Sequence, residues 1–158
     1  MNLPFHMRRP GEKEITLDEL ILAVKRYIDK DPNAHYEMAI GTDSQNFNRT
    51  KIVTVVAIHN IGHGGTYFYQ IDYLPLIKDI NQKLYTETEL SLNIANRIFS
   101  EFEGYNNISK QIHVDAGYYG KTKPLIPGLT AWVRSCGYEV AVKPMSFAAS
   151  SIANKHSK

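Results

Sequence analysis

Apolar residues follow two different periods along this chain, and the changes between them outline its elements. Between residues 17 and 28 they recur every three or four positions, which predicts an amphipathic helix. Thr16 and Glu19 flank its first turn in the form of a capping box, and Asp31-Pro32-Asn33 ends it. Residues 1–15 mix proline, glycine and charge, and we expect them to form an extended arm.

Three strand-like segments follow this helix, at 36–42, 51–61 and 66–73. The second is dense in β-branched residues, which favour strands. Gly62-His63-Gly64-Gly65 has the composition of a hairpin turn between the second and third segments. Because short links join antiparallel neighbours, we expect these three strands to form a meander.

The rest of the chain alternates between helical and strand patterns. We expect a helix at 84–103, a strand at 111–114, a helix at 125–136, a strand at 138–142 and a last helix from about 146 to the C-terminus. Strands linked by helices pair in parallel. The predicted fold is therefore α/β: one mixed five-stranded sheet, three antiparallel strands then two parallel, with helices on its faces and an extra N-terminal helix.

Composition fits one globular domain spanning residues 1–158. Hydrophobic residues make up 43% of the chain and charged residues 22%. No apolar run approaches the roughly 18 residues that a membrane span needs, and residues 1–10 lack the apolar stretch of a secretory signal. The single cysteine, Cys136, excludes an internal disulfide and a thiolate zinc site, and it favours a cytoplasmic protein.

Two aspartates stand where strands that we expect to be neighbours end. Asp43 follows the first strand and Asp115 follows the fourth. If those strands pair in parallel, both carboxylates lie at the sheet edge where α/β proteins bind ligands. One such aspartate is usually a turn or cap residue, but two converging acids favour a functional site.

A third acid, Glu87, falls on the apolar face of the helix expected at 84–103. At about 100° per residue Glu87 lies near Leu84 in projection, whereas Glu89 lies on the outer face. Glu89 also follows Thr86 by three residues, so a capping box would explain it. Burial of a lone carboxylate is costly, and a metal ion or a hydrogen-bond donor offsets that cost.

Three carboxylates at one sheet edge form an oxygen-rich site suited to Mg²⁺ or Mn²⁺. Two such ions about 4 Å apart activate a water and stabilise the leaving oxygen when a phosphodiester is cleaved. We therefore expect Asp43, Glu87 and Asp115 to be the catalytic, metal-binding residues of a metal-dependent nuclease.

The order of the elements and of these acids resembles the ribonuclease H-like fold. More narrowly, IGTDSQ (40–45), HVDAG (113–117) and VKPMSFAASSIANKH (142–156) are similar to the YkuK-type family of predicted ribonuclease H-like proteins. The resemblance spans residues 16–158. It implies a divalent-metal nuclease acting on nucleic acid, with the same three acids as metal ligands.

The resemblance also implies a fourth acidic or histidine ligand near the last helix, where this chain has Met145 and Asn154. An amide ligates a hard cation more weakly than a carboxylate, so we expect Asn154 to be a weak substitute and the second metal ion to be weakened or absent. The neighbouring candidates are Ser146, Ser150 and His156. His156 either orients a water or lies solvated at a frayed chain end, and the second interpretation is favoured.

The segment from Asp115 to Thr122 nearly matches a phosphate loop, but Asp115 replaces the first glycine and Pro124 interrupts the following helix. An NTPase is therefore the least favoured function. We expect the loop instead to hold a substrate backbone. Its Tyr118 and Tyr119 either stack on bases or serve packing, since tyrosine is abundant in this chain. The expected substrate contacts are Ser44, Gln45, Gly117, Tyr118, Lys121, Lys123, Lys143 and His156.

The net charge of +2 conceals an uneven distribution. Residues 1–105 hold 11 basic and 14 acidic side chains, whereas residues 106–158 hold 7 and 2. The basic excess lies in segments expected to flank the acids, where it would attract a phosphate backbone. We therefore expect a nucleic-acid partner. The main alternative to a nuclease is a non-catalytic nucleic-acid-binding or assembly domain with a degenerate site.

Overall fold

The computed structural model describes residues 2–158, and its elements follow the predicted order. The helices are α1 (Leu17–Asp29), α2 (Ile80–Ile98), α3 (Ile126–Ser135) and the short α4 (Asn154–Ser157). The strands are β1 (Tyr36–Asn46), β2 (Thr50–Asn60), β3 (Gly64–Leu74), β4 (Ile108–His113) and β5 (Glu139–Ala141). None of the helices within residues 2–158 has the length and apolar character that crossing a membrane requires.

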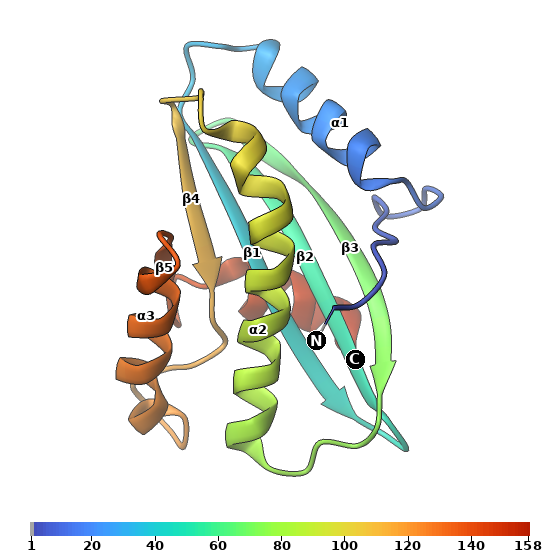
Figure 1. Cartoon of the computed structure of the whole chain (residues 1–158), viewed down its shortest axis with the longest axis vertical. Coiled ribbons are helices and arrows are strands. Elements are labelled where there is room, and N and C mark those ends of the chain that lie inside the picture. Colours follow the sequence, from blue (N-terminus) through green and yellow to red (C-terminus); the bar gives the residue numbers. More distant parts are fainter. Residues whose placement is uncertain (1) are drawn as a thin grey trace.

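The five strands form one sheet in the order β3-β2-β1-β4-β5 (Figure 1). β1, β2 and β3 pair antiparallel as a meander, β4 pairs in parallel with β1, and β5 pairs in parallel with β4. The predicted fold class, a mixed sheet with helices and an extra N-terminal helix, is confirmed.

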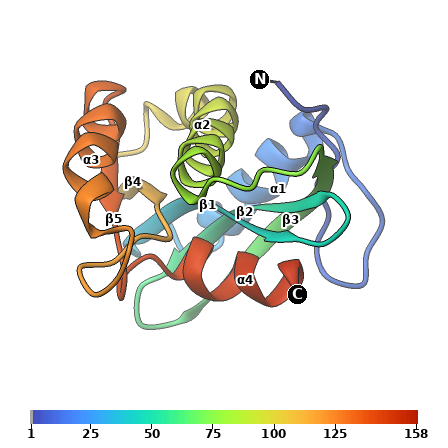
Figure 2. The ribbon, with the colours of Figure 1, turned by 90° about the horizontal axis from the view of Figure 1, so that it is seen from below.

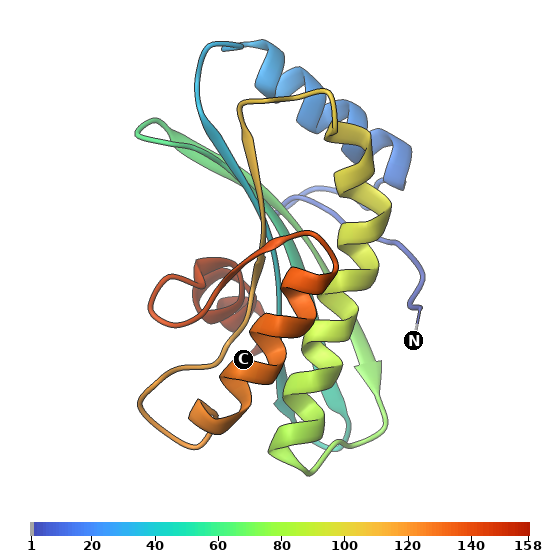
Figure 3. The same cartoon turned by 60° about the vertical axis from the view of Figure 1, so that its left-hand side comes forward.

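Helices cover both faces of the sheet. Figure 2 shows α1, α2 and α3 on one side of the strands and the C-terminal helical segment on the other, and Figure 3 shows the same layers from the side. The larger apolar core includes Leu20 of α1, Ile98 of α2 and Leu129 of α3, together with Ile40 of β1. A smaller cluster, which includes Ala39 and Ala148, lies under the C-terminal segment.

Several element boundaries differ from the prediction by a few residues, and two of these differences matter for the site. β1 continues to Asn46 because β2 pairs with it along its whole length, so Asp43 lies within a strand rather than after it. α2 begins at Ile80, with the side chain of Asp79 accepting the N–H of Asn81 at 3.2 Å as the N-cap. The predicted capping box at Thr86 and Glu89 is therefore wrong, whereas the one at Thr16 and Glu19 is confirmed.

The last helical segment begins with a π-helix at Ala148–Ala153 and continues into α4. It passes very close to β1 at Gly41, where an added Cβ would lie 2.5 Å from the backbone nitrogen of Ala149. The backbone N–H of Ala148 donates to Nδ1 of the buried His113 at 3.1 Å. Burial lowers the pKa of His113 to about 4, which keeps the imidazole neutral and able to accept.

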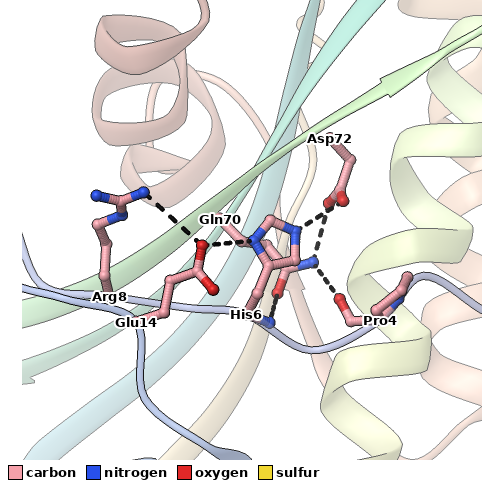
Figure 4. Close-up of polar contacts among 6 residues, drawn as sticks. All are labelled: Pro4, His6, Arg8, Glu14, Gln70 and Asp72. Carbon is pink, nitrogen blue, oxygen red and sulfur yellow. Dashed lines mark hydrogen bonds and ion pairs between the residues drawn. The ribbon is translucent and has the colours of Figure 1, made fainter.

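The described part of the N-terminal arm runs along the outer edge of β3 (Figure 4), and Met1 lies outside the described residues. The backbones of Arg8 and Tyr69 exchange two hydrogen bonds, of 3.0 and 2.9 Å. The buried side chain of Gln70 accepts the N–H of His6 and donates to the carbonyl of Pro4, both at 3.1 Å. The arm therefore covers an otherwise open strand edge.

We expect Gly41→Ala to destabilise the protein by about 1–3 kcal/mol, because the new methyl group would push the C-terminal segment away from β1. Urea unfolding followed by circular dichroism measures the change. Gly104→Ala is the matched control, since a Cβ there meets nothing within 4 Å. Equal unfolding midpoints for the two variants would contradict the close packing at Gly41.

Candidate metal centre

The three predicted acids line one pocket at the edge of the sheet. The cavity has a volume of about 230 Å³. Its lining residues are Asp43, Ser44, Gln45, Ile80, Lys83, Leu84, Glu87, Asp115, Thr122, Lys143 and Asn154. The acids come from three parts of the chain that are far apart in the sequence, so the tertiary fold assembles this acidic pocket.

The strand register explains why the two aspartates meet. Gly41 of β1 pairs with His113 of β4 in parallel, and β4 ends at that residue. Asp43 and Asp115 each stand two residues after this pair, so they reach the same edge of the sheet. Glu87 reaches the pocket from α2, which packs on β1 beside Ser44.

Asp43 is only 4% exposed, and the C-terminal segment supplies its hydrogen bonds. Asn154 Nδ2 donates to its Oδ2 at 3.0 Å, and Ser157 Oγ donates to the same oxygen at 2.9 Å. Burial raises the pKa of Asp43, and the neighbouring Asp115 raises it further through its charge, while the two donors lower it. The two aspartates are thus close enough to interact strongly.

Glu87 is buried on the sheet side of α2, as its helical position predicts. Ser44 Oγ donates to its Oε2 at 2.6 Å. Burial raises the pKa of Glu87 to about 8, and the charges of Asp43 and Asp115 act in the same direction. Near neutral pH the side chain is therefore largely protonated, and a bound cation would favour its ionised form.

Asp115 is the most exposed of the three acids, and among residues 2–158 it is the one that forms an ion pair with a lysine. Ser150 Oγ donates to its Oδ1 at 2.8 Å, and Lys143 Nζ lies 3.1 Å from the same oxygen. Ser150 in turn hydrogen-bonds to the buried Ser146 at 2.6 Å. A chain of hydroxyl groups from the C-terminal segment thereby fixes the orientation of this carboxylate.

The chemistry of these donors fits a hard divalent cation. The hydroxyl, amide and lysine groups contact only Oδ2 of Asp43, Oε2 of Glu87 and Oδ1 of Asp115. Each carboxylate thus keeps a second oxygen that these donors do not use. Among residues 2–158, however, no three His, Cys, Asp or Glu side chains already converge closely enough to hold an ion. Binding therefore requires the carboxylates to draw together, and the charge of the bound cation would offset the repulsion that this increases.

The predicted substrate-binding residues divide into two groups. Ser44, Gln45 and Lys143 line the acidic pocket together with Asn154. The other predicted contacts lie outside its lining: Gly117, Tyr118, Lys121, Lys123 and His156. Tyr118 is 56% exposed and both loop lysines are exposed, so these three border solvent, whereas Gly117 is buried and His156 is half-buried.

His156 is neither in the pocket nor solvated at a frayed end, so that prediction is corrected. Its ring stacks on Tyr69 with centroids 4.0 Å apart, and its Nε2 lies 2.9 Å from the hydroxyl of Tyr67. Burial lowers the pKa of His156. The histidine therefore attaches the chain end to β3, which a sequence pattern gives no means of foreseeing.

The near match to a phosphate loop does not form one. The backbone N–H of Gly117 donates to the hydroxyl of Thr122 at 3.2 Å, so this hydroxyl is already engaged. A 3₁₀ turn at Lys123–Leu125 separates the loop from α3. The loop also opens on Asp115, whose charge repels phosphate.

Comparison with known proteins agrees with this architecture. A family model described as Ribonuclease H-like matches residues 19–158. The chain belongs to the ribonuclease H-like family. It is also 30% identical over 162 residues to the uncharacterized protein YkuK of Bacillus subtilis (strain 168), with 94% of each chain covered. The resemblance to YkuK-type ribonuclease H-like proteins is thus confirmed.

Sequence reasoning missed some polar residues of this ribonuclease H-like site, Ser157 and Lys83 among them. Ser157 donates to Asp43, and Lys83 lines the pocket from α2. Ser157 stands three residues after Asn154, and Lys83 stands four before Glu87, so both share a helical face with a predicted site residue. That spacing was a usable signal for each of them.

We expect Glu87→Gln to stabilise this ribonuclease H-like chain above pH 8 in the absence of metal. The raised pKa of Glu87 favours folding fully below about pH 4.5, and this contribution is lost as the pH rises towards 8. Each pKa unit corresponds to about 1.4 kcal/mol, so the variant should gain a few kcal/mol over wild type by pH 8.5.

Urea unfolding at pH 5 and at pH 8.5 in EDTA tests this expectation, with exposed Glu101→Gln as the control. The difference between Glu87→Gln and wild type should be small at pH 5 and large at pH 8.5. A difference that does not change with pH would show that Glu87 is not buried as described.

Proposed function

We propose that this ribonuclease H-like protein is a divalent-metal-dependent nuclease that hydrolyses phosphodiester bonds in nucleic acid. The observation that carries the proposal is the acidic pocket itself. Asp43, Glu87 and Asp115 come from β1, α2 and the loop after β4, yet they share one cavity in which burial and mutual repulsion raise the pKa of two of them. Such a site is unfavourable when empty and suits a cation.

In this proposal the three carboxylates hold Mg²⁺ or Mn²⁺, which would supply Lewis acidity and an activated water. The surrounding residues orient the ligands. Ser44 fixes Glu87, Ser150 fixes Asp115, and Asn154 fixes Asp43 by donating its amide N–H. Second-layer hydrogen bonds of this kind are typically worth 10- to 100-fold in metal affinity or activity.

Nucleic acid is the substrate class that the surroundings of the pocket favour. The loop after Asp115 exposes Tyr118 and the fully exposed Tyr119, which offer flat surfaces for bases. Lys121 and Lys123 are exposed in the same loop and would attract phosphates. We expect the protein to act in the cytoplasm, consistent with its single free cysteine.

A non-catalytic nucleic-acid-binding domain is the second candidate. Two observations favour it. Met145 is 71% exposed and contributes no ligand, and Asn154 gives its amide N–H to Asp43 instead of an oxygen to a metal. In that case the lysines and tyrosines of the loop bind a strand that the acidic pocket does not cut.

We expect Asp43→Asn to lower metal-dependent cleavage at least about 100-fold, because it removes the charge of a ligand while keeping its shape. Purified protein is incubated with single-stranded, duplex and hybrid oligonucleotides in Mg²⁺, Mn²⁺ or EDTA. Exposed Glu101→Gln serves as the charge-matched control and should cleave like wild type.

Three outcomes are informative. Cleavage that EDTA and Asp43→Asn both abolish supports the nuclease. Oligonucleotide binding without cleavage in any metal overturns it and leaves the binding domain. Cleavage that persists in Asp43→Asn assigns the activity to another site or to a contaminant.

A further inference from the structure

Lys143 is the only residue among 2–158 that forms an ion pair with an acid of the pocket. Its Nζ lies 3.1 Å from Oδ1 of Asp115. It also lines the same cavity as Asp43 and Glu87. The acidic pocket therefore already contains a positive charge that the chain holds directly against one of the acids.

The fold directs this lysine towards Asp115. Lys143 lies just beyond β5, and its backbone N–H donates to the carbonyl of Ala116 at 2.8 Å. Its side chain then crosses Gly117, where an added Cβ would lie 3.3 Å from the Cβ of Lys143 and 3.4 Å from its Cδ. The absence of a side chain at Gly117 leaves room for the lysine stem beside the acid.

The charges in the pocket match one divalent ion better than two. Asp43, Glu87 and Asp115 carry three negative charges when ionised. With the two lining lysines, Lys143 and Lys83, one divalent ion gives four positive charges and two ions give six, so one ion comes closer to balance and a second leaves a large excess of positive charge. The remaining groups around Asp43, namely Asn154 and Ser157, are neutral and cannot compensate.

We propose that Lys143 acts as a built-in cation in place of a second metal ion, so that the pocket binds one Mg²⁺ or Mn²⁺. This rests on the proposed metal-dependent function and specifies how its site is charged. Beside Asp115 the ammonium group also offers a point charge to a substrate phosphate. Lys143 is therefore a residue that sets metal stoichiometry.

Metal binding measured without substrate tests this role. Calorimetric titration with Mn²⁺ gives the number of ions per chain for wild type, Lys143→Glu, Lys143→Met and Lys30→Met. We expect one ion in wild type and two in Lys143→Glu, which adds a fourth acid. Lys143→Met should bind its ion about tenfold more tightly, since a like charge is removed. Lys30→Met, from an exposed lysine just after α1 and outside the pocket lining, should match wild type.

The possible results separate the two proposals. Two ions in wild type would overturn the role of Lys143 and leave the nuclease proposal standing. No bound ion even at high Mn²⁺ would overturn the metal-dependent function itself. A single ion in folded Lys143→Glu would also overturn the role of Lys143. If Lys143→Glu does not fold, unchanged affinity in Lys143→Met decides against it.

Discussion

The acidic pocket holds negative charge away from water, and the need to compensate this charge determines the contacts around the pocket. Asp43 and Glu87 are almost fully buried, and Asp115 lies beside them. Burying charged carboxylates without partners is among the costliest arrangements in a protein. Hydroxyl and amide donors offset part of this cost, and Lys143 offsets a further part. Protonation of Glu87 removes some of the charge itself. A bound cation would compensate the rest.

This compensation links the site to the packing of the C-terminal segment. Ser150, Asn154 and Ser157 reach the aspartates only because this segment lies directly on β1. Gly41 permits that approach, and the neutral ring of His113 accepts a hydrogen bond from the backbone N–H of Ala148, where the segment begins. Residues that look purely structural therefore set the geometry of the acids, so changes in the packing of this face should also change the site.

Much of this arrangement follows from the sequence because it depends on short-range patterns. The periodicity of apolar residues predicts the order of elements, and strand order then places Asp43 beside Asp115. The helical position of Glu87 predicts its burial. The end of β1 was not predictable, because polar residues 43–46 resemble a turn until the pairing with β2 is known. The contacts of Lys143 and His156 depend on how the chain end folds back, which no local pattern encodes.

The central claim is that Asp43, Glu87 and Asp115 together bind a divalent cation, and anomalous X-ray diffraction from crystals grown with Mn²⁺ tests it most directly. The proposed site predicts an anomalous peak in the acidic pocket within about 2.5 Å of oxygens from all three side chains. A pocket without a peak at saturating Mn²⁺, or a peak bound only by other residues, would contradict the claim.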